Sequence, residues 1–286
     1  MPERSRTPSA NKRPLTLGLD RLNLQDVADV AREGRLVATL PREVVDRLEA
    51  TSDWVSRTVT AIEQTRQSDR KPAAYYGINT GFGALAGQTA LDSAYLTKVL
   101  GRNLVASHSV GVGAYFDPSI VRAALLIRAH SLAQGYSGVR PVVAETLRRM
   151  LNESVYPAIP EQGSLGASGD LAPLAHMILT MCRVPRPEPG AADLGLDETD
   201  GEAFVPCALG DREPGTFYKV TEGYATGAQT LWRRVPGSEA MAAVGGKLEL
   251  HAKEALALSN GCTFSAAIAA LAVRDAWNLL ENAELA

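Results

Sequence analysis

The stretch from Gly163 to His176 constrains this chain more than any other part of the sequence. Its centre, Ala167-Ser168-Gly169, consists of small residues, and Gly169 can adopt backbone angles that a side chain would forbid. Attack of the Gly169 nitrogen on the carbonyl carbon of Ala167 would close a five-membered ring. Loss of water from that ring and from the Ser168 side chain would then leave a methylidene-imidazolone, an electrophile that no ordinary side chain supplies.

The residues after this tripeptide favour a helix. The segment from Asp170 to Met181 is mostly apolar, and Pro173 falls in the first turn, where proline is tolerated. The tripeptide would then lie at a helix N-terminus, where unpaired N–H groups and the helix dipole stabilise developing negative charge. Taken alone, Ala-Ser-Gly is more simply a glycine-rich turn that leads into a buried helix.

With 286 residues, 45% hydrophobic and 21% charged, the chain has the composition of a soluble globular protein of one or two domains. A net charge of -3 gives no reason to expect a nucleic acid partner. No uninterrupted apolar run reaches membrane-spanning length, and the polar, basic residues 1–14 predict a disordered leader rather than a secretory signal. The three cysteines and four histidines lack the spacing of metal ligands or of a disulfide framework. We therefore expect a cytoplasmic protein without a metal site or membrane contact.

Helical periodicity dominates the chain, without strand–helix alternation or a fixed repeat. Residues 15–183 are expected to form one helical domain that contains an irregular, glycine-hinged loop over residues 70–87. Residues 184–240 are rich in proline, glycine and acids, which predicts a partly disordered surface insertion. Residues 241–286 are helical again, and the apolar face of the last helix needs a partner. The fold class is therefore all-α.

Start and stop signals place several of these helices. Asn23 and Gly34 bracket a short amphipathic helix, and Pro41 opens a longer one. Two further helices are expected to start at Asp117-Pro118 and at Pro141.

The stretch from Gly163 to His176 as a whole closely resembles the signature of the aromatic amino-acid ammonia-lyases and aminomutases. This family builds its methylidene-imidazolone (MIO) autocatalytically from the tripeptide that corresponds to Ala167-Ser168-Gly169. Three further segments resemble the family in the same order: Tyr76 to Gly83, Arg102 to His108, and Lys253 to Gly261. The similarity is closest to histidine ammonia-lyase. Two departures are Gly101, where glutamine is usual, and Cys262, where threonine is usual.

The resemblance implies a role for each of these segments. Tyr76 would be the base on a mobile lid, and a tyrosinate in a dry site can take a weakly acidic proton. His108 would hydrogen-bond the polar ring of the substrate, while Asn260 would contact both the MIO and the bound amino acid. Leu171 would also contact the substrate.

Simpler interpretations of the same residues stay open. The glycine-rich loop around Tyr76 could be a phosphate loop, but it lacks the GKS or GKT of that motif and follows no predicted strand. His108 could be an ordinary, partly buried helical histidine. Asn260-Gly261 could be merely a turn or a helix C-cap. A serine hydrolase is disfavoured, because Asp170 occupies the last position of what would otherwise read as GxSxG.

By this resemblance the chain is an ammonia-lyase that eliminates ammonia from an aromatic L-amino acid, with histidine as the first choice and tyrosine as the second. The alternatives are a tyrosine-type 2,3-aminomutase and a non-catalytic helical partner of a full-length lyase. Relatives assemble as tetramers around a central helical bundle, and residues 241–286 would begin that bundle.

The resemblance runs from about residue 16 to the last residue and is interrupted by the insertion at 184–240. Relatives are much longer, and their second half carries a Gln-Asp-x-Tyr-Ser-x-Arg segment whose arginine binds the substrate carboxylate. This segment is absent from the 286 residues. A truncated chain, a split enzyme and an inactive relative would each explain the absence. We expect an incomplete or split enzyme, which works as a homo-oligomer or with a companion chain that carries the missing half.

Overall fold

The computed structural model describes residues 12–19, 21–87, 94–165, 167–183, 185, 200–208, 216–222 and 229–286. Its helices are α1 (Leu24–Arg32), α2 (Arg42–Gln67), α3 (Ala94–His108), α4 (Pro118–Ala133), α5 (Pro141–Asn152), α6 (Leu171–Met181), α7 (Gly237–Ala242), α8 (Glu254–Ser259) and α9 (Thr263–Leu285), with a short 3-10 helix, η2 (Gly83–Leu85). Its strands are β1 (Val112–Tyr115), β2 (Tyr156–Pro157), β3 (Pro160–Gln162), β4 (Cys182–Arg183), β5 (Glu202–Cys207), β6 (Tyr218–Glu222), β7 (Gln229–Pro236) and β8 (Leu248–Glu249).

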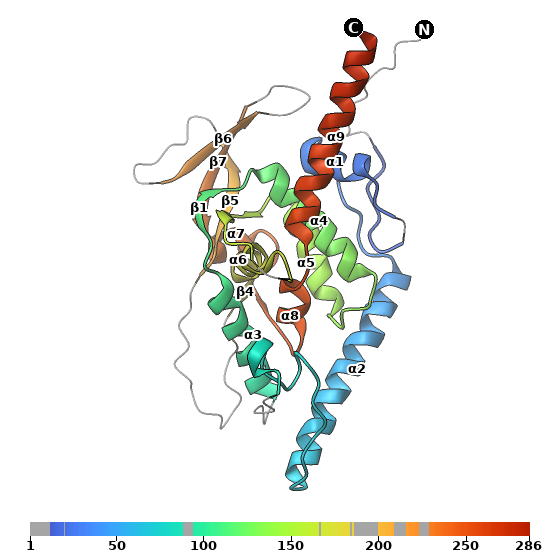
Figure 1. Cartoon of the computed structure of the whole chain (residues 1–286), viewed down its shortest axis with the longest axis vertical. Coiled ribbons are helices and arrows are strands. Elements are labelled where there is room, and N and C mark those ends of the chain that lie inside the picture. The colour runs from blue at the N-terminus through green and yellow to red at the C-terminus, as the bar shows by residue number, and fades with distance from the viewer. Residues whose placement is uncertain are drawn as a thin grey trace.

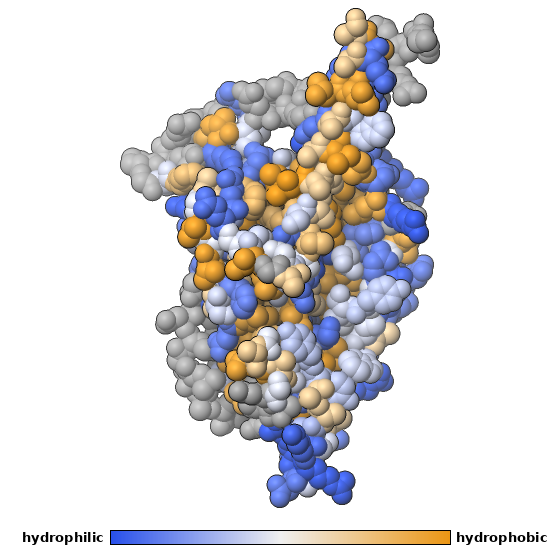
Figure 2. Space-filling model, viewed as in Figure 1, coloured by the Kyte–Doolittle hydropathy of each residue, from blue (hydrophilic) through white to orange (hydrophobic). Residues whose placement is uncertain are grey.

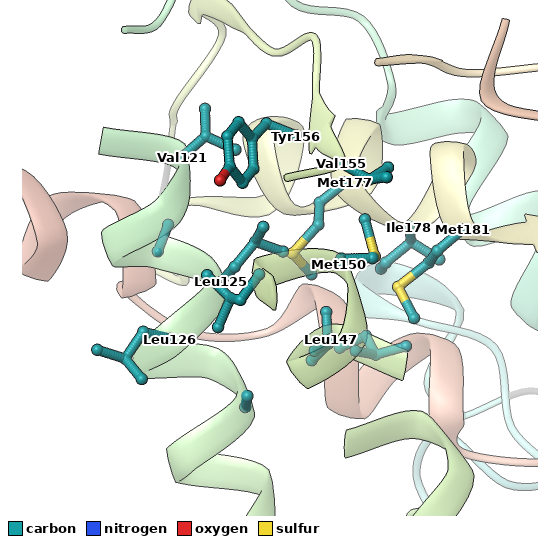
Figure 3. Close-up of a cluster of buried hydrophobic side chains, with 14 of the residues drawn as sticks. Val121, Leu125, Leu126, Leu147, Met150, Val155, Tyr156, Met177, Ile178 and Met181 are labelled. Carbon is teal, nitrogen blue, oxygen red and sulfur yellow. The ribbon is translucent and has the colours of Figure 1, made fainter. Parts of the chain in front are cut away.

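Helices α4, α5 and α6 form the centre of the molecule (Figure 1). Helices α1 and α9 pack against α4, and helices α3 and α8 pack against α6. The inward faces meet in one apolar cluster, in which Leu125 of α4, Leu147 of α5 and Met177 of α6 are fully buried (Figure 3). Burying each such side chain contributes about 1.5–3 kcal/mol to stability. The cluster therefore fixes the position of α6, and with it the turn that precedes α6.

The local start signals correctly predicted where several helices begin. Asn23 caps α1 through a reciprocal pair of hydrogen bonds with Asp26, in which the Asp26 N–H donates to Asn23 Oδ1 at 2.9 Å. The Asp117 carboxylate caps α4 by accepting the Ser119 N–H at 2.9 Å. Helix α5 begins directly at Pro141. These helix starts therefore confirm the predictions made from capping residues and from proline.

A four-stranded antiparallel sheet, in the order β2-β5-β7-β6, is the main feature that the all-α prediction lacked. Strands β5 to β7 lie in the segment that was expected to be an irregular insertion. They turn Phe204 and Leu231 toward the core, where both are about 1% exposed. The apolar alternation was hidden because the strands are short and β5 contains Pro206. The described part of this segment also includes the start of α7, and residues 184, 186–199, 209–215 and 223–228 lie outside the described residues.

The predicted leader is anchored at its end. Residues 1–11 lie outside the described residues, but Lys12 forms an ion pair with the buried Asp29 at 2.7 Å. The Arg35 guanidinium also donates to the Arg13 carbonyl at 2.9 Å. These contacts join Lys12 and Arg13 to α1 and to the segment after it, while the disorder expected over residues 1–14 stays a prediction.

Helix α9 projects from the rest of the molecule at its C-terminal end (Figure 1). Its first half packs on α4 and α1, and Asp275 accepts a hydrogen bond from Arg32 of α1 at 2.9 Å. By length and composition alone, the stretch Glu254–Leu285 could cross a membrane, although 33% of its apolar window is buried inside the chain. The core helix of a soluble protein passes the same test, so this finding does not assign the chain to a membrane.

Candidate active site

Ala167, Ser168 and Gly169 form the turn that precedes α6, after strand β3. Gly169 has φ of +85°, which is the left-handed region that glycine adopts without strain. Ala167 is exposed and Ser168 is half-buried, so the tripeptide is at the surface of this chain. The turn therefore consists of small residues and contains a glycine whose backbone angles permit a tight bend.

The Ser168 hydroxyl is held by the segment that joins α8 to α9. Its Oγ donates to Asn260 Oδ1 at 2.7 Å and accepts the Gly261 N–H at 3.3 Å. The hydroxyl thus has a donor and an acceptor on neighbouring residues that lie far along the chain. Ser168 and Asn260 were expected to share a site, and the structure places their side chains in direct contact.

Asp170 ties the start of α6 to the start of α9. Its buried carboxylate accepts the Ser265 N–H and the Ser265 hydroxyl, both at 2.9 Å, and the Ser164 hydroxyl at 3.1 Å. The Ser265 N–H is one of the first-turn donors of α9 that have no partner within the helix. The N-termini of two helices, α6 and α9, therefore meet beside Ser168, where both dipoles favour negative charge.

Helix α8 is short and is fixed at both ends. At its start, the buried Glu254 carboxylate accepts from Arg140 Nη2 at 2.8 Å and from the His251 N–H at 2.8 Å. At its end, Arg128 of α4 donates through Nη1 to the carbonyls of Ala257 at 3.3 Å and Asn260 at 3.1 Å. The position of Asn260 is thus set by two arginines from different elements.

Tyr76 lies on the irregular loop between α2 and α3, with half of its surface exposed. Its hydroxyl accepts the Gly83 N–H at 3.4 Å, and its ring packs edge-on against Phe82. The neighbouring Gly77 sits against α8, because a Cβ there would lie 2.2 Å from Leu256 Cδ2. The loop therefore contacts the helix that ends at Asn260, but no contact between described residues joins Tyr76 to Ser168.

His108 is the last residue of α3, and its side chain folds back on its own helix. Its Nδ1 lies 2.9 Å from the Leu104 carbonyl and 3.0 Å from the Ser107 hydroxyl. These contacts fit the simpler view of an ordinary helical histidine. Leu171 is partly buried as the first residue of α6, directly after the turn that holds Ser168. Within the described residues, no hydrogen bond joins His108 to Ser168.

His176 is part of the signature stretch, but no separate role was predicted for it. Its Nε2 accepts the Gly111 N–H at 3.0 Å, which ties α6 to the segment before β1. Burial lowers the pKa of His176, which keeps the ring neutral and Nε2 free to accept.

The two departures from the family pattern both lie at this site. A Cβ at Gly101 of α3 would lie 3.0 Å from the Ala255 Cβ of α8, so a glutamine there would push these helices apart. Cys262 is exposed beside the tripeptide, and a Cβ at Gly169 would lie 3.6 Å from the Cys262 Cβ. The site can therefore differ in shape from that of relatives with glutamine and threonine.

Arg128 and Ser265 contact the site but were not predicted from the sequence. Arg128 had a signal, since it is the one charged residue inside the apolar run 123–129 of α4. A buried arginine normally has a specific partner, so it could have been marked as a candidate. Ser265 had none, because its partner Asp170 lies 95 positions earlier. Among the described residues, no group of three or more His, Cys, Asp or Glu side chains could hold a metal ion.

The helical core and the Ala-Ser-Gly turn at a helix N-terminus place this chain in the class of the ammonia-lyase and aminomutase fold. The family model for aromatic amino acid lyases matches residues 22–286, and the chain belongs to this family. The resemblance read from the sequence is thereby confirmed.

Individual relatives agree with this assignment. Histidine ammonia-lyase from Alkaliphilus metalliredigens is 37% identical over 266 residues, and that from Sorangium cellulosum is 39% identical over 266 residues. Each alignment covers 93% of this chain and 42% of the relative, so the chain spans less than half of their length. The structure of tyrosine aminomutase from Streptomyces globisporus superposes with a TM-score of 0.62 and 27% identity, covering 90% of this chain and 38% of that one.

Proposed function

We propose that this chain is the MIO-forming part of an ammonia-lyase that acts on an aromatic L-amino acid, with histidine as first substrate and tyrosine as second. The observation that carries the proposal is the Ser168 hydroxyl, held by Asn260 and Gly261 within an intact Ala-Ser-Gly turn. The choice of histidine is supported by the names of the two relatives, which are histidine ammonia-lyases. We expect a cytoplasmic enzyme that works as a homo-oligomer or with a companion chain.

The residues of the turn fit the group that they would form. Gly169 already has a positive φ, and a Cβ at that position would meet nothing closer than 3.6 Å, so the turn has room to tighten. The Gly261 N–H donates to the Ser168 oxygen, the atom that leaves when the side chain loses water. The MIO supplies an electrophilic methylidene that takes up the amino group of the substrate.

The other predicted residues would act around this centre. Asn260 is in place to orient groups bound at Ser168, since their side chains are already in contact. Tyr76 would hold the abstracted proton on its hydroxyl, and the contact of its loop with α8 keeps it on the same side of the molecule as Asn260. The Tyr76 oxygen can accept a proton while the Gly83 N–H still donates to it, because the oxygen has more than one lone pair. The contact with the Leu104 carbonyl involves Nδ1 of His108, so its Nε2 would be the atom that meets a substrate ring.

A tyrosine-type 2,3-aminomutase is the second candidate function. It is favoured by the structural similarity to tyrosine aminomutase at 27% identity. A lyase and an aminomutase share the elimination step and differ in how long the unsaturated acid is held, which depends on how the site closes. A non-catalytic helical partner is the third candidate, and the intact tripeptide argues against it because an inactive copy has no chemical need for that tripeptide.

Intact-mass spectrometry of the purified chain tests the proposal directly. We expect a mass lower than that of the 286-residue sequence by two water molecules, because ring closure and dehydration of Ser168 each remove one. Tryptic mapping should place the entire loss in the peptide that contains Ala167 to Gly169. An unmodified mass in freshly purified, folded protein would exclude the MIO and leave the partner-subunit alternative.

His108 provides a test of substrate choice. In the assembled enzyme, His108→Phe should shift preference from histidine or tyrosine toward phenylalanine, because a polar partner is replaced by an apolar ring. The expected change in relative kcat/KM corresponds to about 1–3 kcal/mol of discrimination. His108→Gln, which keeps a hydrogen-bonding side chain, is the matched control and should retain more of the original preference. Unchanged ratios of kcat/KM for the three amino acids in His108→Phe would make His108 a structural residue.

A further inference from the structure

We infer that Arg128 of α4 is a positioning residue for MIO formation. It holds the Asn260–Gly261 peptide in place, and this peptide hydrogen-bonds the Ser168 hydroxyl in the geometry needed for dehydration. This inference rests on the proposed function, because it concerns how the Ala167-Ser168-Gly169 turn is prepared for ring closure. Arg128 contacts neither Ser168 nor any residue of the turn through a hydrogen bond within the described residues. Its effect is transmitted through Asn260 and Gly261.

The contacts of Arg128 converge on the end of α8. Its Nη1 donates to the backbone carbonyls of Ala257 and Asn260, which lie in the last turn and cap of that helix. Carbonyls at a helix C-terminus lack partners within the helix and carry partial negative charge, so a guanidinium is well matched to them. Arg128 therefore takes the place of a local C-cap and fixes where α8 stops.

The Asn260–Gly261 peptide lies between Arg128 and Ser168. On one side, the Asn260 carbonyl accepts from Arg128; on the other, the Asn260 side chain and the Gly261 N–H both contact Ser168 Oγ. Gly261 has φ of +140°, and a Cβ there would lie 2.9 Å from Arg128 Nη2. Only glycine allows the guanidinium to approach this closely, so a shift of Arg128 would move both groups that hold Ser168.

A buried arginine at position 128 is also unfavourable for the stability of the fold. It is 5% exposed, and within the described residues its Nε and Nη2 have no hydrogen-bond partner. Burial lowers the pKa of Arg128 to about 10, while the nearby Asp170 carboxylate opposes that shift, so the group stays charged at neutral pH. A buried cation with unsatisfied N–H groups destabilises a fold, and packing alone would favour an apolar side chain here.

The charge has a second consequence for the turn. Arg128 lies within electrostatic range of both Asp170, which follows the turn, and Cys262, which lies beside it. The guanidinium is buried, so water screens its charge little, and this fixed positive charge favours the negative charge that develops when the Ser168 oxygen leaves. Arg128 thus supports dehydration by position and by charge without touching the reacting atoms.

The test is a time course of intact mass for the full chain after cell-free synthesis, with Arg128→Met as the main variant. Methionine keeps an unbranched side chain but removes the charge and donors, so loss of two waters should be slower by roughly tenfold or more. Arg128→Lys should recover part of the rate, because an ammonium can reach one carbonyl but lacks the fork of a guanidinium.

Arg122→Met is the matched control. Arg122 lies on the same helix, is partly buried, has a pKa lowered by burial to about 10, and also donates to a backbone carbonyl, that of Val30. That carbonyl is in α1, away from Ser168, so Arg122→Met should lower the melting temperature yet cyclise at the wild-type rate. If Arg128→Met does not fold, Gly261→Ala replaces it, because the added Cβ displaces the same guanidinium and strains the peptide that holds Ser168, so cyclisation should again be slower than in the wild type.

Each outcome has a distinct meaning. Wild-type cyclisation rates in folded Arg128→Met or in Gly261→Ala would overturn the inference and leave the proposed function standing. Equal slowing in Arg122→Met and Arg128→Met would also overturn it, since the effect would then be one of general stability. A wild-type chain that never loses two waters would overturn the proposed function and this inference together.

Discussion

Replacement of Ser168 by alanine is expected to abolish MIO formation and all lyase activity while the protein stays folded. Alanine has no hydroxyl to lose, so no methylidene can form, yet it fits the same small, partly exposed turn. The variant gives up only the two hydrogen bonds to Asn260 and Gly261. A neutral hydrogen bond contributes about 0.5–1.5 kcal/mol, so the fold should survive.

The measurement combines intact mass and circular dichroism of the chain itself with an assay for the ultraviolet-absorbing unsaturated acid in the enzyme assembled with its companion chain. Ser168→Ala should show no loss of water, a native spectrum and, in the assembled enzyme, no product. Ser56→Ala is the control, because Ser56 is exposed on α2 and its hydroxyl donates to the Ser52 carbonyl of the same helix. That control should cyclise normally and, once assembled, turn over normally. Full turnover by folded Ser168→Ala would sink the MIO proposal.

The helices could be predicted because their signals are local. The capping pair of Asn23 and Asp26, the Asp117 cap and Pro141 each act within one helical turn, so a short window of sequence contains all the information. The sheet could not be found in this way. Strand β5 pairs with β7, and Phe204 is opposite Arg234, a partner 30 positions later that no local pattern identifies. Sheet propensity depends on such neighbours more than on the strand itself.

In the candidate site, too, local features could be predicted and contacts between distant residues could not. The tight turn at Gly169 and the helix after it follow from the local sequence, and the structure contains both. The contact of Ser168 with Asn260 joins residues 92 positions apart, and only the family resemblance placed them together. Physical pattern reading gave Arg128 no role, because its partners are backbone carbonyls of another helix. The carbonyl of any residue can accept such a hydrogen bond, so the residue types at positions 257 and 260 do not reveal that Arg128 binds there.

The open surroundings of the turn point to a further dependence on other chains. Ala167, Asn260 and Cys262 are all exposed in this chain, although an electrophile works best where water is excluded. Helix α9 carries large exposed apolar residues along its outer half, and Figure 2 shows orange and pale side chains beside blue ones on the projecting end of the molecule. Among them, Trp277 is 53% exposed and Leu279 is 72% exposed. Exposed apolar surface of this kind is typical of an interface.

We therefore expect the 286-residue polypeptide alone to self-associate and to show little or no lyase activity. The chain spans 42% of the two histidine ammonia-lyases, and the carboxylate-binding arginine expected from the family is absent from it. Activity should appear when a companion polypeptide that carries the remaining part of the family sequence is added, because that part would cover α9 and complete the site.

Size-exclusion chromatography with light scattering, together with the product assay, tests both parts of this prediction. Paired substitution of the exposed Trp277 and Leu280 by glutamine should weaken self-association and the response to the companion, since both lie on the outer half of α9. The same substitutions should leave MIO formation unchanged, because the first turn of α9, where Ser265 binds Asp170, is not altered. A monomer that turns over histidine at an ordinary rate, about 1–1,000 per second, would show that the chain needs no companion.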